Sequence, residues 1–77
     1  MDELQQLAVD LQLTVMREVT GHDAISAWEW VDDLVEEAFM EVPRPLYLRI
    51  FLDEVQKRAS RSREILDKIE AIKKLLA

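Results

Sequence analysis

Residues 48–76, LRIFLDEVQKRASRSREILDKIEAIKKLL, decide the fold of this chain. Nine positions of this stretch, most of them apolar, follow one another at steps that alternate between three and four residues without a slip. This spacing keeps one face of a helix against a partner helix. We call this set the seam, and it consists of Leu48, Phe51, Val55, Arg58, Ser62, Ile65, Ile69, Ile72 and Leu76.

The seam predicts a third helix over residues 46–77. A continuous helix of this length is about 48 Å long, whereas a compact chain of this size is only about 30 Å across. We favour the continuous helix, because the spacing passes undisturbed through Ser60 and Ser62. The alternative is a break near residues 60–62, where either serine is able to cap a fourth helix.

Helix-forming residues also dominate the first part of the chain. A first helix is predicted over residues 2–19, with Gly21 closing it and Asp23 as the N-cap of the next helix. This first helix is apolar over most of its circumference, because Leu13 and Met16 widen its apolar stripe. Helices of this kind are buried on more than one side.

A second helix is predicted over residues 24–42, where Pro43 and Pro45 end it. Its inner positions include Trp28 and Val31, and Ile25 and Phe39 broaden the inner stripe. The 77 residues therefore predict a single helical domain over 1–77. Its fold class is all-α: a small three-helix bundle, or a four-helix bundle if the last helix breaks.

Two arrangements satisfy the seam. In the first, it is a coiled-coil interface of a homodimer, in which the polar Arg58 and Ser62 fix register at some cost in stability. In the second, the same face packs on the first two helices of its own chain. A chain this short gains only about 3–5 kcal/mol from one core, and without cysteine it has no disulfides to add. We therefore predict a homodimer.

Charge is sorted along the chain. Residues 1–43 hold eleven acidic side chains and one basic one, Arg17, whereas residues 44–77 hold nine basic and five acidic ones. The net charge of −6 disfavours nonspecific attraction to nucleic acid or anionic lipid. The acidic start of the chain differs from a signal peptide, and no run approaches the ~18 apolar residues of a membrane span. We expect a cytoplasmic protein without membrane contact.

The residues that carry chemistry are sparse. One histidine and no cysteine disfavour a zinc site. No serine or threonine has the histidine or lysine arrangement of a nucleophile, and one glycine cannot build a phosphate-binding loop. We predict that the protein is not an enzyme and that it uses no cofactor and no metal.

The second helix carries an acidic face with a tryptophan in it. Trp30 is predicted to lie beside the carboxylates, as an anchor for a protein partner. The alternatives are an ordinary hydrated helix face and a Trp30 that covers the edge of the core. The residues proposed for this acidic interface are Trp30, Glu29, Asp33, Glu36 and Glu37.

Basic residues of the third helix suggest phosphate contacts, made by Lys57, Arg61 and Arg63 beside Arg58. The helix lacks the interleaved aromatic residues of single-strand binders, and acidic residues stand among the basic ones. The leading hypothesis is a small regulatory protein that binds another protein. The alternatives are a dimeric nucleic-acid-associated regulator and a self-assembling structural subunit.

Overall fold

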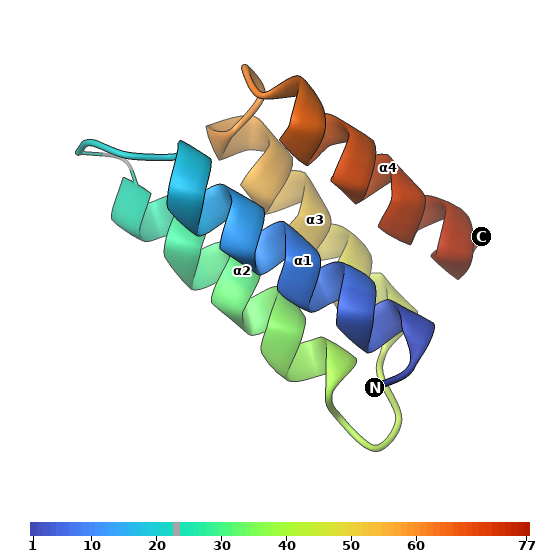
Figure 1. Ribbon diagram of the computed structural model, residues 1–77. Coiled ribbons are helices and arrows are strands. Elements are labelled where there is room, and N and C mark those ends of the chain that lie inside the picture. Colours follow the sequence, from blue (N-terminus) through green and yellow to red (C-terminus); the bar gives the residue numbers. More distant parts are fainter. Residues whose placement is uncertain (23) are drawn as a thin grey trace.

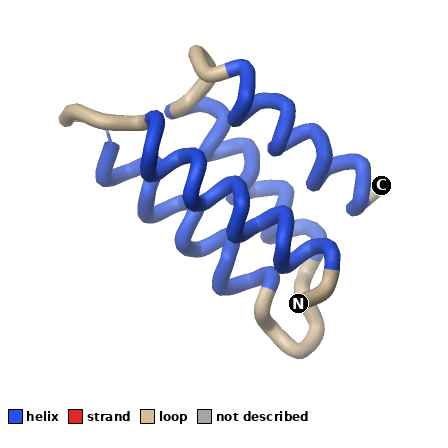
Figure 2. The backbone as a smooth tube through the Cα atoms, in the orientation of Figure 1, coloured by secondary structure: helices blue, strands red, loops and turns tan. Residues whose placement is uncertain are grey.

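Four helices make up the computed structural model, which describes residues 1–22 and 24–77. They are α1 (Glu3–Glu18), α2 (Ala24–Ala38), α3 (Pro45–Arg58) and α4 (Arg63–Leu76). The described residues contain no strand, so the prediction of an all-α chain is confirmed. Figures 1 and 2 show the helices running alternately up and down, joined by three short connections.

The helices form a ring in which each contacts the next. Contacts join α1 to α2, α2 to α3, α3 to α4 and α4 back to α1, while the diagonal pairs within the described residues do not meet. The bundle measures 34 × 21 × 20 Å. Its core is entirely aliphatic, and its largest fully buried side chains are Leu11, Leu34, Leu48, Leu52, Ile65, Ile69, Ile72, Val15, Val31 and Val55.

The predicted continuous helix over residues 46–77 is wrong, and the alternative break is correct. The chain turns at residues 59–62, where the Ala59 N–H donates to the Gln56 carbonyl and Ser62 caps α4 by accepting from the Ile65 N–H at 3.2 Å. A straight helix would leave the isoleucines of its second half in water. By turning back, the chain buries them against α1, and this burial outweighs the undisturbed helical spacing.

The first two helices begin where they are predicted to begin, but α2 ends at Ala38 rather than at residue 42. Its last turn tightens, because the Met40 N–H donates to the Glu37 carbonyl three residues back. Pro43 excludes the helical conformation at the residue before it, so the helix stops several residues earlier. Gly21 does not close α1 as predicted, because the helix ends at Glu18 and its C-cap, Val19, is already extended. With a φ of 102°, Gly21 instead turns the connection to α2, where its carbonyl accepts from the Ala24 N–H. The predicted N-cap, Asp23, lies outside the described residues.

Candidate functional site: the outer face of α1 and α2

The seam is used inside the chain. Its residues Val55, Ile65, Ile69 and Ile72 are fully buried, and Phe51 and Leu76 pack against the core from its edge. In this conformation the buried residues offer no area to a second chain. The structure therefore has the arrangement in which the seam packs within its own chain, and the predicted homodimer needs another surface.

The two polar seam residues make intramolecular contacts. The Arg58 Nε donates to Ser26 Oγ of α2 at 2.7 Å, and its Nη1 lies 2.8 Å from a Glu54 carboxylate oxygen. Ser62 caps α4 and donates its hydroxyl proton to Glu18 of α1. Both residues thus mark the place where the seam changes helices.

Trp30 lies between α2 and α3. Its ring packs on Phe51 with the ring centroids 5.9 Å apart, and the Arg58 guanidinium lies 5.5 Å from its centroid. It is half-buried against the core, as in the alternative placement at the core edge. Because most of its ring is covered by the core, Trp30 has little exposed area left to act as the predicted anchor on the acidic face.

Glu37 does not belong to the exposed acidic face in which it was predicted to lie. It is only 4% exposed, and it accepts hydrogen bonds from the Arg44 backbone N–H, Nε and Nη2 at 3.0, 3.0 and 2.7 Å. The Arg44 side chain lowers the pKa of this carboxyl, because its hydrogen bonds favour the charged form. The pair fixes the α2–α3 connection. In the sequence, this role is indicated only by the presence of Arg44, a basic residue seven positions after Glu37 and on the other side of Pro43.

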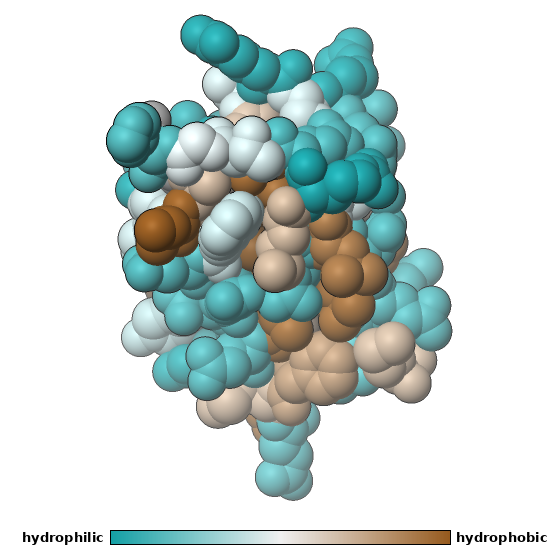
Figure 3. Space-filling view, turned by 60° about the vertical axis from the view of Figure 1, so that its left-hand side comes forward, coloured by the Kyte–Doolittle hydropathy of each residue, from teal (hydrophilic) through white to brown (hydrophobic). Residues whose placement is uncertain are grey.

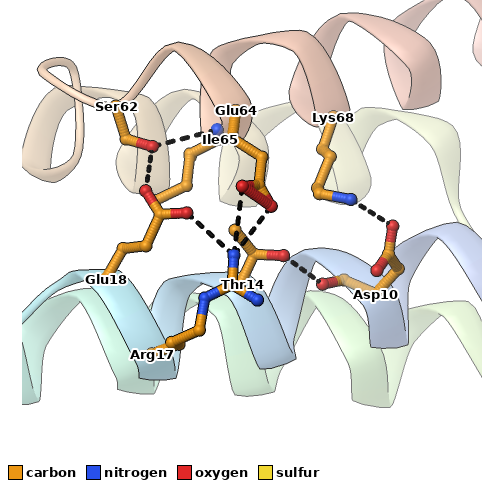
Figure 4. A network of polar contacts seen from close by, with 8 residues as sticks. All are labelled: Asp10, Thr14, Arg17, Glu18, Ser62, Glu64, Ile65 and Lys68. Atoms are coloured by element: carbon orange, nitrogen blue, oxygen red, sulfur yellow. Dashed lines mark hydrogen bonds and ion pairs between the residues drawn. The ribbon is translucent and has the colours of Figure 1, made fainter.

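A polar network joins α1 to α4 on another side of the bundle (Figure 4). Lys68 pairs with Asp10 at 2.5 Å, and Arg17 reaches Glu64 at 2.8 Å. Arg17 also contacts Glu18. The pKa of Glu18 is lowered mainly by the hydrogen bond from the Ser62 hydroxyl and, to a smaller extent, by the one from Arg17. The two ion pairs between the helices have opposite polarity, because α1 supplies the carboxylate of the first and the guanidinium of the second.

The three residues predicted to contact phosphate have different surroundings. Lys57 pairs with Glu54 at 3.2 Å, whereas Arg61 and Arg63 are exposed and make no ion pair within residues 1–22 and 24–77. Lys57 and Arg61 both line an open depression of about 570 Å³ near the α3–α4 connection, with Glu18 at its other side. Arg63 lies outside the lining.

The outer face of α1 and α2 carries apolar side chains that the sequence had assigned to the interior. Leu13 and Ile25 are 61% and 62% exposed, and Met16 and Phe39 are also exposed. Sequence analysis predicted α1 to be buried on more than one side, and Ile25 and Phe39 to belong to the inner stripe of α2. The placement of Ile25 and Phe39 in the inner stripe is wrong. α1 does pack on two sides, against α2 and α4, but its outward side, which carries Leu13 and Met16, is exposed.

One hydrogen bond fixes how the two helices of this face are aligned. The Gln12 Nε2 of α1 donates to Asp32 Oδ1 of α2 at 2.7 Å. On α2, Ile25 and Phe39 stand seven residues before and after Asp32, so they lie on the same side of the helix. On α1, Met16 stands one turn from Gln12. The apolar residues thus lie at both ends of a face that Gln12 and Asp32 connect.

Carboxylates border the apolar residues along α2. They belong to Glu29, Asp32, Asp33 and Glu36, all of which are exposed. Among the described residues, none of the four forms an ion pair. In Figure 3, apolar side chains gather from the middle of the visible face into its lower part, with hydrophilic side chains beside and below them. We call the apolar residues Leu13, Met16, Ile25 and Phe39, with these four carboxylates, the outer α1–α2 face.

Comparison of the chain with protein-family models, curated proteins and solved structures gave no match. In the part of the chain that the structure describes, no group of histidine and acidic side chains is arranged to hold a metal ion. No helix of that part has both the length and the hydropathy to cross a membrane.

Proposed function

We propose that this protein acts without catalysis, by binding another protein on the outer α1–α2 face. The observation that carries the proposal is the exposure of Leu13, Met16, Ile25 and Phe39 on two neighbouring helices. Apolar side chains that are exposed on one face add nothing to the stability of the isolated chain and promote association.

The size of this surface supports the proposal. At about 150–250 Å² for a large side chain, the exposed parts of the four residues leave on the order of 400–500 Å² of apolar area. The largest apolar patch of an ordinary monomer is about 300–600 Å² and is often functional. One partner of a standard protein complex contributes about 800 Å², of which somewhat more than half is non-polar. The outer α1–α2 face therefore has the area of one side of such a complex.

Self-association is a second candidate, and a different surface favours it. Val42, Leu46, Tyr47 and Ile50 are exposed at the α2–α3 connection and along α3. Leu46 and Ile50 are one turn apart, so they form a short apolar strip. A homodimer through this strip would leave the buried seam intact. Light scattering distinguishes a monomer of 9.0 kDa from a particle of twice that mass.

The nucleic-acid alternative has less support. Lys57, Arg58 and Lys68 are paired with Glu54 or Asp10. Among the residues that the structure describes, Arg61 and Arg63 are therefore the cations of this basic run that form no ion pair. Two exposed arginines neutralise too few phosphates to hold a chain of net charge −6 on nucleic acid at ordinary salt.

The test compares two double variants of equal chemistry. Leu13→Glu with Met16→Glu changes the outer α1–α2 face, and Leu46→Glu with Ile50→Glu changes the α3 strip. Each tagged protein is used to capture partners from nuclease-treated lysate, and the captured protein is then purified and titrated against both variants. We expect one partner at fixed stoichiometry, lost only with the first variant. Equal binding to both variants would refute the proposal.

A further inference from the structure

We infer that the occupant of the outer α1–α2 face is a cationic amphipathic helix of another protein, an inference that rests on the function proposed above. The face has an apolar stripe and a border of unpaired carboxylates. A helix with one apolar side and lysine or arginine along its edge complements both features.

The dimensions of the face fit a helix of about four turns. Ile25 and Phe39 are 14 positions apart in the numbering, which corresponds to about 21 Å along a helix axis. The Phe39 N–H still donates to the Val35 carbonyl, so this residue continues the course of α2 beyond its last helical residue. Apolar side chains at steps of three, four and seven on an occupant helix would meet Ile25, Phe39 and the α1 residues along this length.

The charges on the two sides of the stripe differ, and this difference orients the occupant. On the α2 side, Glu29, Asp33 and Glu36 carry unpaired negative charge. On the side of α1 that faces α4, Asp10 and Arg17 are already paired with Lys68 and Glu64. The occupant therefore places its cationic edge over α2, while its other edge gains little from charge.

At the centre of the face, Asp32 accepts from Gln12 through one carboxylate oxygen, Oδ1. A carboxylate has acceptor sites on both oxygens, so it is able to receive a second donor from the occupant. An arginine or lysine at the middle of the occupant helix, between its apolar anchors, satisfies this position.

Neither α3 nor α4 of a second copy provides such a helix. The exposed strip of α3, Leu46 and Ile50, spans only about one turn of the four that the face accommodates. The apolar side of α4, which carries Ile65, Ile69 and Ile72, is fully buried in its own bundle. Its cations Lys68 and Lys73 are paired with acidic residues of the same chain. Nucleic acid and anionic lipid carry the same sign of charge as the α2 border, so it repels them.

The test uses synthetic peptides of about 14 residues, the length of four helical turns. The first carries leucines at helical spacing with lysines along one edge. A scrambled peptide has the same composition, and a third peptide has glutamate in place of lysine. Titration into ¹⁵N-labelled protein gives the affinity and the residues whose amide shifts change. We expect binding of the first peptide alone, with shifts confined to α1 and α2.

Matched charge variants test the α2 border. The triple variant Glu29→Gln, Asp33→Asn, Glu36→Gln is expected to weaken binding of the first peptide about tenfold, since each exposed charge pair contributes modestly. The control triple variant has the same net charge and neutralises exposed carboxylates elsewhere. It consists of Glu3→Gln, Asp67→Asn and Glu70→Gln.

The inference is overturned by equal losses in the two triple variants, by comparable binding of the scrambled or glutamate peptide, or by shifts that map to α3. Failure to bind the first peptide at millimolar concentration overturns it as well. If the cellular partner still depends on Leu13 and Met16 in that case, the proposed function stands and only the partner chemistry is wrong. If the partner ignores both residues, the proposed function fails too.

Discussion

Replacing Ile69 by alanine tests whether the seam works inside one chain. Ile69 lies in the middle of α4, is 0% exposed and packs in the core that α4 shares with α1. Removing a buried isoleucine side chain to the β-carbon costs about 2–5 kcal/mol, because apolar burial is lost and a cavity remains. We expect a loss of about 3.5 kcal/mol, within that range.

That loss is large relative to the whole stability of the chain. For 77 residues, a total free energy of unfolding of about 4–11 kcal/mol is typical. The urea midpoint should fall by about 3.5 M at a slope of roughly 1 kcal/mol/M, and Tm by about 14–28 °C. If the alanine variant does not fold, Ile69→Val serves in its place. It costs about 1 kcal/mol, stays folded and should lower the free energy of unfolding in the same direction.

Urea unfolding followed by circular dichroism, repeated over a hundredfold range of protein concentration, decides between the two arrangements of the seam. An intramolecular seam gives a midpoint independent of concentration, whereas an intersubunit seam gives one that rises with concentration. Leu75→Ala on the same helix is the control, since Leu75 is 41% exposed and its loss should cost well under half as much. A concentration-dependent midpoint, or equal losses in the two alanine variants, would refute the reasoning.

Three further predictions concern single contacts. Glu37→Gln should lower stability near neutral pH. Because the Arg44 hydrogen bonds lower the pKa of Glu37, the deficit should be full above the ordinary pKa of a glutamate and shrink as the pH falls from there through the lowered pKa; urea titrations near pH 7 and about pH 2.5 compare the two ends of this range. Ser62→Ala removes the α4 cap and should cost about 1 kcal/mol, whereas Ser62→Asp should restore most of it, as thermal unfolding will show. Trp30→Ala should destabilise the fold by more than 1 kcal/mol, because its ring packs on Phe51; an unchanged Tm would contradict this placement.

The spacing of apolar residues was sufficient to predict where the first helices lie, because apolar periodicity and proline or glycine boundaries act locally. Gly21 and Pro43 mark the first two connections, and the first helix was predicted to within a residue at each end. The break at Ser62 was left as an alternative because its energy is not local. It depends on burying Ile65 and Ile69 against α1, and heptad spacing is the same whether a helix continues or turns back.

The site was harder to predict, since exposure depends on which side of a helix the bundle covers. Leu13 and Phe39 look like core residues in the sequence, and Glu37 looks like a surface residue. The structure reverses all three, because α1 and α2 each have neighbours on two sides only and Arg44 reaches Glu37 from the next helix. Periodicity finds apolar stripes but does not say whether the same chain supplies the neighbour.

Ion pairs inside the bundle distinguish the contact between α1 and α4 from the outside of α2. Between α1 and α4, Asp10 of the first half pairs with Lys68 of the second, and Arg17, the one basic residue of the first half, pairs with Glu64. The carboxylates on the outside of α2 have no such counterpart, since the ring of helices gives that side no neighbour.

If the proposed partner is cationic, raising the salt concentration from about 0.05 to 0.5 M should weaken its binding steeply, because the Debye length then shortens to less than half. The intramolecular fold should change little over the same range, because its aliphatic core does not depend on charge. Calorimetric titration and thermal unfolding in the same buffers compare the two responses, and a binding constant as insensitive to salt as Tm would argue against the charged border of this face.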